Sequence, residues 1–304
     1  MTFSRHIPAC LIAGLVLALT LAGCATPEGL LTPPPATPTP SASPSPAPVV
    51  VTPSPSPVPT PSVEPYDYSR PAPETGEADD AWFSDAVFVG DSRTDGLRLY
   101  GGIKQSNFIC YKGLTSEEFD TKKCIKLGEE TVTALEALER GSYAKVYLML
   151  GLNELGYAVP TFSQEYSEVI DMVRAAQPNA VLYFQSVVPL NPQRVEESKL
   201  PTYFNNEKVA AFNAEIFRLC EEKQVVYLNV AEGLTDENGI LPYERTHDGV
   251  HFSRDWYKQW YAYLKTHTVD PDTLEVPTHE ETPDAPAYSV PVPGTDAVQL
   301  GLRK

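Results

Sequence analysis

Between residues 86 and 266 the sequence alternates short apolar runs with longer segments that carry apolar residues along one helical face. The apolar runs are typical of buried strands and lie at 86–90, 108–111, 145–150, 180–188 and 225–230. The amphipathic segments are typical of helices and lie at 129–140, 163–177, 205–223 and 254–266. Strands that are apolar on both faces and separated by helices form a parallel sheet covered on both sides. We therefore expect a three-layer α/β/α fold with about five parallel strands.

The first 23 residues have the pattern of a secretory signal peptide. Arg5 precedes an apolar run that extends to Ala22, and no stop-transfer charges follow it. The end of this run, LAGC at 21–24, resembles the bacterial lipoprotein signal box. The resemblance implies cleavage before Cys24, a lipid on its sulfur, and a protein anchored to the outer face of the bacterial cell membrane. An ordinary signal peptide that happens to contain Cys24 is the alternative.

Two further segments have compositions that do not favour a packed core. Residues 24–78 are rich in Pro, Ser and Thr, and Glu28 is the only charge between positions 25 and 63. Such a composition favours an extended, disordered linker. Residues 269–304 are acidic and rich in Pro, and we interpret them as a tail. Residues 79–268 remain for one globular domain, which is long enough to bury a sizeable core.

Charge and cysteine content exclude several classes of function. The net charge of −17 argues against nucleic acid or an anionic lipid surface as a partner of the folded domain. Beyond the signal segment and Cys24, the cysteines are Cys110, Cys124 and Cys220, and their spacing matches no metal site. A Cys110–Cys124 disulfide and free thiols both remain open. No metal or cofactor is implied.

Chemically active residue types follow the ends of the predicted strands. In parallel sheets, ligands bind at the carboxyl ends of the strands. The segments found there are GDSR at 90–93, KGL at 112–114 and GLNE at 151–154, and DGVH at 248–251 precedes the last helix. One edge of the sheet thus receives a Ser, a Gly, an Asn and an Asp/His pair.

These four segments, in this order, resemble the SGNH or GDSL-type esterase/lipase superfamily. Each motif alone is weakly specific, but the four occur in register through the whole predicted domain. The family has a flavodoxin-like α/β/α sandwich, which agrees with the fold expected from the periodicity of the sequence.

The resemblance implies a role for each matched residue. Ser92 is the nucleophile, His251 is the base that accepts its proton, and Asp248 accepts the other imidazole N–H. The backbone N–H groups of Ser92 and Gly113 and the side-chain amide of Asn153 form the oxyanion hole. Each of these residues also has a structural interpretation. Ser92 and Asp248 are common helix caps, Asn153 is common in turns, and His251 is of a type that also serves structure.

Two residues depart from the family pattern, and a second histidine competes for the role of base. Arg93 stands where the family name has Leu, and it either contacts an anionic group of the substrate or pairs with Asp91 or Asp95. Glu154 stands where Asp is usual. His247 is the close competitor of His251 for the role of base.

The sequence therefore predicts an extracellular, membrane-tethered serine esterase. The expected substrates are O-acyl esters, with O-acetyl groups on an envelope or environmental polysaccharide foremost. A second interpretation is an O-acetyltransferase that acts on a surface glycan with a membrane partner. A third is a binding lipoprotein without catalysis. Loops such as 155–163 and 190–204 are expected to set specificity.

Overall fold

The structure, a computed structural model, describes residues 64–274. Its main sheet has five parallel strands in the order β2-β1-β5-β6-β7. The strands are β1 (Ala86–Gly90), β2 (Asn107–Cys110), β5 (Lys145–Met149), β6 (Val181–Gln185) and β7 (Val226–Leu228). The predicted α/β fold with five parallel strands is therefore confirmed.

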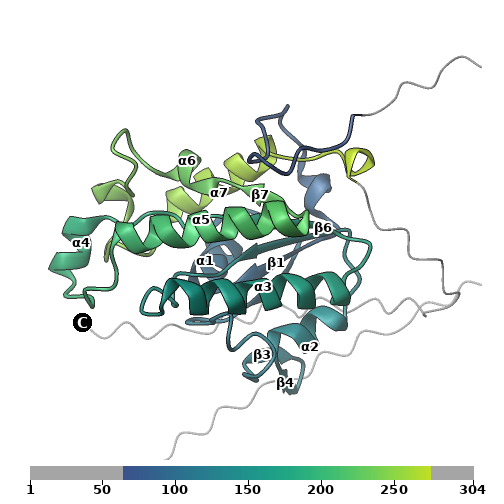
Figure 1. Cartoon of the computed structure of the whole chain (residues 1–304), viewed down its shortest axis with the longest axis horizontal. Coiled ribbons are helices and arrows are strands. Elements are labelled where there is room, and N and C mark those ends of the chain that lie inside the picture. Colours follow the sequence, from purple (N-terminus) through teal and green to yellow (C-terminus); the bar gives the residue numbers. More distant parts are fainter. Residues whose placement is uncertain (1–63, 275–304) are drawn as a thin grey trace, which may run out of the picture. The chain divides into compact units, whose positions relative to one another are not determined.

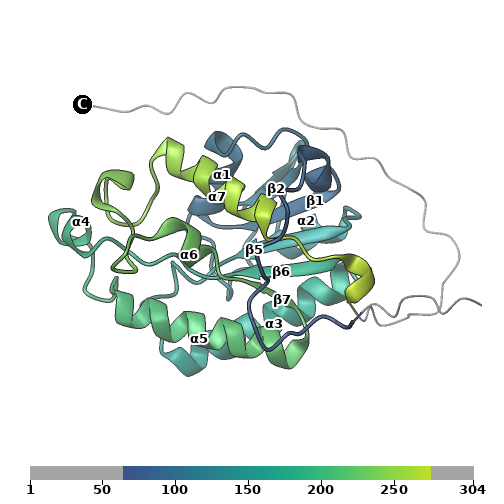
Figure 2. The same cartoon turned by 90° about the horizontal axis from the view of Figure 1, so that it is seen from above.

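Helices cover both faces of this sheet (Figures 1 and 2). One face packs against α1 (Ser92–Tyr100), α6 (Val230–Leu234) and α7 (Arg254–Thr266). The other face packs against α2 (Ala134–Glu139), α3 (Val159–Ala176) and α5 (Asn206–Lys223). Short elements complete the described part, namely α4 (Pro192–Glu197) and the 3₁₀ turns η1 (Asp80–Phe83), η2 (Tyr243–Arg245) and η3 (Pro271–Thr273).

The two cores follow from the alternation of side chains along the strands. In β1, Val87 and Val89 belong to the core under α3 and α5, whereas Phe88 belongs to the core under α1 and α7. Phe88 stacks on Tyr147, which stacks on Tyr183 at a ring-centroid distance of 4.5 Å. Large apolar side chains on both faces explain why the strands read as continuous apolar runs.

The structure corrects the helix predicted over 129–140. A two-stranded hairpin of β3 (Ile125–Leu127) and β4 (Glu130–Val132) occupies its first part. Gly128 turns the hairpin with a φ of +62°, a conformation that favours glycine. Helix α2 begins only after Thr133, whose side chain and that of Glu136 form a capping box.

Described residues on both sides of the predicted limits of 79 and 268 pack on the domain. The backbone N–H of Ala72 donates to the carbonyl of Tyr227 in β7, and that of Tyr66 donates to the carbonyl of Thr273, both at 2.9 Å. Ala72 is buried, as is Val269 in the segment after α7. We call residues 66–72 the strap. Composition did not predict it, because the residues other than Pro in a Pro-rich chain still have N–H groups and can pair at a sheet edge. The predicted signal peptide, Cys24 and most of the linker and tail lie outside the described residues.

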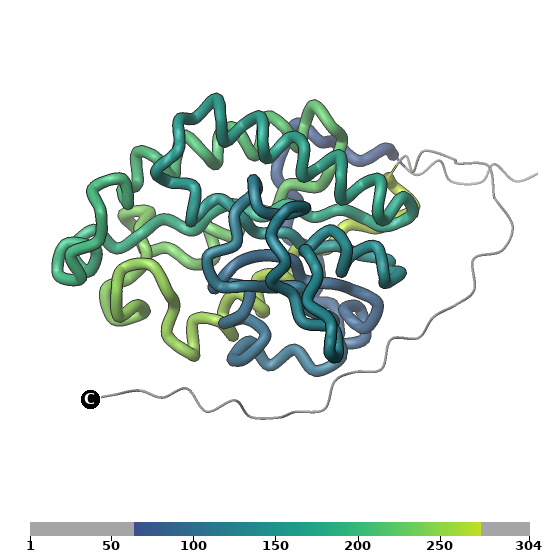
Figure 3. Tube along the Cα trace, turned by 90° about the horizontal axis from the view of Figure 1, so that it is seen from below, coloured from purple at the N-terminus to yellow at the C-terminus, as the bar shows by residue number. Residues whose placement is uncertain are grey.

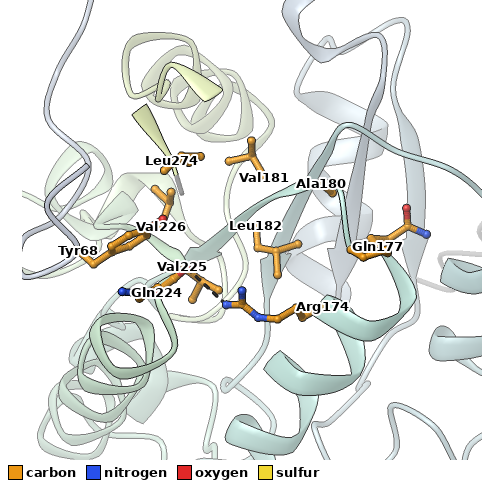
Figure 4. A pocket seen from close by; sticks show the side chains of 11 residues that line it. Tyr68, Arg174, Gln177, Ala180, Val181, Leu182, Gln224, Val225, Val226 and Leu274 are labelled. Atoms are coloured by element: carbon orange, nitrogen blue, oxygen red, sulfur yellow. Dashed lines mark hydrogen bonds between the residues drawn. The ribbon is translucent and has the colours of Figure 1, made fainter. Parts of the chain in front are cut away.

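The first and last described residues meet at one end of the sheet. Figure 3 shows the purple start and the yellow end of the coloured tube side by side. Tyr68 and Leu274 line a small cavity of about 40 Å³ together with Val181 and Val226, the first residues of β6 and β7 (Figure 4). The strap therefore lies at the amino ends of these strands. Within residues 64–274, no helix combines the length and the apolarity that crossing a bilayer requires.

Candidate active site

The carboxyl ends of three adjacent strands align. Gly90, the last residue of β1, pairs with Cys110 at the end of β2 and with Met149 at the end of β5. The segments that follow these strands therefore start side by side. This register brings the loops of Ser92, Gly113 and Asn153 to one edge of the sheet.

Ser92 lies in a tight turn from strand to helix. A Cβ atom on Gly90 would come within 2.4 Å of the Met149 carbonyl oxygen, so the turn requires glycine there. The Asp91 side chain caps α1 by accepting a hydrogen bond from the N–H of Arg93 at 2.8 Å. Ser92 is thus the first residue of the helix, and Asp91 takes the role of cap.

Ser92, His251 and Asp248 form a continuous hydrogen-bonded chain. Ser92 Oγ lies 2.8 Å from His251 Nε2, and His251 Nδ1 lies 2.7 Å from Asp248 Oδ2. A proton on Nδ1, facing the carboxylate, leaves Nε2 as the acceptor for the serine hydroxyl. The residue types, order and distances are those of a nucleophile, its base and the group that orients the base. His247 does not take part in this chain.

A tight turn holds the acid and the base in place. Asp248 Oδ1 accepts hydrogen bonds from the backbone N–H groups of Val250 and His251 at 2.9 and 2.8 Å. Burial opposes ionisation of Asp248, but its bonds to the His251 ring and to these N–H groups outweigh burial. The pKa of Asp248 therefore lies well below its usual value. Gly249 makes the turn possible with a φ of +87° and packs against the backbone of Val195 in α4.

This edge of the sheet is open to solvent. The side chains of His251 and Asp248 are 47% and 38% exposed. A solute can therefore reach the hydrogen-bonded chain from outside the protein.

The Gly113 loop and the serine turn each offer a backbone N–H at this edge. Gly113 has a φ of +81°, and no atom lies within 4 Å of the place where a Cβ would be. Its N–H donates none of the hydrogen bonds found within residues 64–274, so it is free to bind an oxyanion. The N–H of Ser92 lies in the first turn of α1, where no helical carbonyl precedes it.

Asn153 is held by two acceptors. Its Nδ2 donates to Asp91 Oδ2 and to the carbonyl of Leu114, both at 3.1 Å. This fixes the amide beside both the serine turn and the loop of Gly113. To bind an oxyanion, the amide has to share or release one of these bonds. Asp91, the acceptor of one of these bonds, is itself buried, and burial raises its pKa.

Glu154, the next residue, is completely buried. Its Oε1 accepts from the N–H and the hydroxyl of Ser116, and its Oε2 accepts from the N–H of Gly151 at 3.1 Å. Burial raises the pKa of Glu154 to about 7, although the hydrogen bonds from Ser116 oppose that rise. The carboxyl thus connects the loops that follow β2 and β5.

Arg93 lies inside the protein rather than at the open edge, and it makes neither of the ion pairs considered for it from the sequence. Its side chain is fully buried. Nε donates to the carbonyl of Val250 and Nη1 to the carbonyl of Val188, each at 3.0 Å, and the guanidinium lies over the Phe252 ring. It forms a side-chain ion pair with neither Asp91 nor Asp95; Asp95 instead binds Arg98. Arg93 therefore supports the loop that carries His251 from behind.

The cysteines are not part of this site. Cys110, Cys124 and Cys220 are free thiols, so the structure contains the thiol alternative rather than the disulfide. Within the described residues no group of three His, Cys, Asp or Glu side chains is placed to hold a metal ion.

Comparison with known families decides the assignment. The model of the GDSL-like lipase/acylhydrolase family matches residues 88–259, more than half of the chain, and includes the whole site. The chain belongs to the GDSL-like lipase/acylhydrolase family. No curated protein sequence matches the chain.

Solved structures similar to this family member include three bacterial proteins. A Streptococcus pneumonia protein provisionally described as a platelet activating factor is 23% identical, with 60% of this chain and 82% of the other covered and a TM-score of 0.49. A GDSL-like lipase from Bacteroides thetaiotaomicron is 18% identical, with 60% and 86% covered and a TM-score of 0.45. A provisionally assigned GDSL-like lipase from Parabacteroides merdae is 14% identical, with 65% and 99% covered and a TM-score of 0.46.

Sequence reasoning missed two supports of the acylhydrolase site. Ser116 carried no motif, and only its contact with Glu154 reveals its position. Asn191 caps α4, and its N–H donates to the carbonyl of Gly249 at 3.0 Å, which braces the turn of Asp248 and His251. The Asn-Pro pair at 191–192 is a helix-start signal that could have located the cap, but nothing in it indicates the contact with Gly249.

Proposed function

We propose that this family member is a serine ester hydrolase with Ser92 as nucleophile, His251 as general base and acid, and Asp248 as the residue that orients His251. The observation that carries the proposal is the chain of hydrogen bonds from Ser92 Oγ through the imidazole to the Asp248 carboxylate, at 2.8 and 2.7 Å. Binding alone does not need this arrangement.

Hydrolysis would proceed in two steps. The Ser92 proton passes to His251 Nε2 as Oγ bonds to the ester carbon, and the resulting oxyanion binds the N–H groups of Ser92 and Gly113 and the Asn153 amide. The imidazolium then donates its proton to the leaving alcohol oxygen as the ester C–O bond breaks. In the second step, His251 Nε2 takes a proton from water as the water oxygen bonds to the acyl carbon. The imidazolium then returns that proton to Ser92 Oγ as the acyl C–Oγ bond breaks, which releases the acid.

We further propose that the substrates are O-acetyl or similar short O-acyl esters on an envelope or environmental polysaccharide. The exposure of His251 and Asp248 supports a large, externally held alcohol component. The net charge of −17 disfavours an anionic lipid surface as substrate. The proposed location is the outer face of the bacterial cell membrane, with lipid on Cys24, and it rests on the sequence pattern alone.

Hydrolysis of p-nitrophenyl acetate tests the chemistry. Ser92→Ala and His251→Ala should each lower kcat by at least about a thousandfold. His247→Ala is the matched control, because it removes a neighbouring exposed imidazole outside the hydrogen-bonded chain. Equal activity of the wild type and Ser92→Ala would disprove the mechanism. Mass spectrometry of envelope glycans incubated with the wild type and with Ser92→Ala then identifies the natural acyl group.

Acyl transfer to a sugar hydroxyl is the second candidate. The open edge beside His251 is the observation that favours it, because a sugar hydroxyl could take the place of water at the acyl-enzyme. Transfer would produce acylated glycan faster than free acetate when a glycan acceptor is added. Stoichiometric labelling of Ser92 by a fluorophosphonate would separate both enzymatic functions from a binding lipoprotein.

A further inference from the structure

Glu154 is a buried carboxyl that has no direct part in the proposed chemistry. No part of its side chain is exposed. Both of its oxygens are engaged, one with the N–H and hydroxyl of Ser116 at 2.8 and 3.0 Å, and the other with the N–H of Gly151 at 3.1 Å. Burying a carboxyl is costly unless hydrogen bonds compensate. A role beyond filling space would account for its presence.

The two loops that Glu154 joins are the loops that carry the proposed oxyanion donors. Ser116 lies three residues after Gly113, and Gly151 lies two residues before Asn153. The Asn153 amide also bonds the carbonyl of Leu114, and the Tyr157 hydroxyl donates to Glu117 at 3.0 Å, so further hydrogen bonds join the same loops. Glu154 is the buried member of this set, and it bonds to both loops at once.

We infer that Glu154 is a positioning residue that, as a carboxylate, holds Gly113 and Asn153 at the spacing an oxyanion requires. This inference rests on the proposed function. Glu154 touches neither Ser92 nor any reacting atom, and it acts through the loops of Ser116 and Gly151. An oxyanion hole stabilises the transition state only when its donors are preorganised.

The contacts require an acceptor at both ends of the side chain. An ionised carboxylate offers only acceptors to the three hydrogens that face it. The amide of a Gln would turn an NH₂ group toward either Ser116 or Gly151, where a donor already stands. The Asp that is usual in the family keeps the charge but is one methylene shorter, so it would draw the loops together or lose a bond.

The surroundings of Glu154 make its ionisation sensitive to pH. The titratable groups that face it are Asp91 from the serine turn, Tyr157 from its own loop and Tyr166 from α3, and none of the three is a cation. With the pKa of Glu154 raised to about 7, protonation near neutral pH converts an acceptor into a donor. At least one of the three bonds must then reverse or break, so the donor spacing should loosen in acid.

Steady-state kinetics of the full chain on p-nitrophenyl acetate test the inference. Glu154→Gln should lower kcat about 10- to 100-fold, the loss expected from a displacement of about 1 Å at an active site. KM should stay close to that of the wild type, because the interaction is made in the transition state. Glu154→Asp should recover part of the loss. Asp120→Asn, which removes an exposed carboxylate farther along the same loop, is the matched control and should behave as wild type.

The pH profile separates positioning from a general loss of structure. In the wild type, protonation of Glu154 should loosen the donors and lower kcat/KM below about pH 7. Glu154→Gln cannot undergo this change, so its log(kcat/KM) should fall less steeply in acid than that of the wild type. An unchanged kcat, or a wild-type acid limb in Glu154→Gln, would overturn the inference.

One further variant keeps the test decisive. If Glu154→Gln does not fold, Ser116→Ala removes one of the three bonds and should lower kcat several-fold at an unchanged melting temperature; an unchanged kcat would count against the inference. Failure of the proposed function looks different, because the wild type would then be inactive or Ser92→Ala would be as active as the wild type. An inactive Ser92→Ala with a fully active Glu154→Gln defeats only the role of Glu154.

Discussion

Replacing Asp248 with Asn tests how the structure sets the tautomer of His251. The two oxygens of Asp248 have different partners, because Oδ1 accepts from two backbone N–H groups and Oδ2 faces His251 Nδ1 at 2.7 Å. In Asp248→Asn, the amide oxygen should take the Oδ1 position, where two donors converge. The NH₂ group must then face Nδ1 and donate to it, which places the ring proton on Nε2. The imidazole can no longer accept the Ser92 proton.

The magnitude follows from this geometry. A wrong tautomer in a serine triad costs about 10⁴ in kcat, and we expect a loss of about 10³ to 10⁴ here. The turn itself should survive, because the amide oxygen keeps both backbone bonds. Asp248→Ala removes those bonds instead, at a cost of about 1 kcal/mol each. Its melting temperature should fall by about 4–8 °C for a domain of this size, while its imidazole remains free to choose the productive tautomer.

The assay compares both variants by p-nitrophenyl acetate hydrolysis and by thermal unfolding. We expect Asp248→Asn to be the more stable variant and Asp248→Ala to be at least as active as Asp248→Asn. An Asp248→Asn variant within tenfold of wild-type kcat would refute the reasoning about the tautomer. If the melting temperature of Asp248→Asn were as low as that of Asp248→Ala, the assigned orientation of the Asn amide would be refuted.

Three other outcomes test the supports of the site. Arg93→Leu leaves the carbonyls of Val250 and Val188 without their donor, so it should lose about 2 kcal/mol of stability in urea unfolding and lower kcat, while Arg93→Lys should lose less. Because the pKa of Glu154 is raised, its contribution to the free energy of unfolding is complete below pH 4.5 and is lost by about pH 7. Between pH 5 and 8 the free energy of unfolding should therefore fall by about 3 kcal/mol more in the wild type than in Glu154→Gln. A larger fall in Glu154→Gln would contradict a raised pKa for this carboxyl. Removing residues 1–78 frees the edge of β7 beside Ala72, so the melting temperature of the remainder should fall, and an unchanged value would show that the strap adds nothing.

The sheet was predictable because its strands are continuous apolar runs, and the site followed because its motifs stand at the strand ends. The hairpin of β3 and β4 was not predictable, because Val132 and the apolar residues after it also fit one face of a helix. Only the turn at Gly128 and the capping box at Thr133 distinguish the two structures, and both are local signals weaker than the periodicity.

Arg93 shows a different limit of sequence reasoning. A charged residue beside a nucleophile suggests contact with substrate, because arginine is seldom fully buried. The Arg93 side chain is instead held inside by hydrogen bonds to the carbonyls of Val188 and Val250, which are remote from it in the sequence. Tertiary acceptors of this kind leave no local pattern. The same holds for Glu154, whose partner Ser116 lies 38 positions away.

The meeting of the strap with the segment after α7 has a consequence for how the domain can be attached to anything else. Tyr68 and Leu274 lie at the amino ends of β6 and β7, whereas Ser92 follows the carboxyl end of the parallel strand β1. Any support joined to the chain at either of these residues is therefore connected at the pole opposite the reactive serine. A surface, a bead or a fused protein joined at either residue would therefore be attached at the end of the sheet opposite the Ser92 loop, and the loops around Ser92 would stay free of the attachment.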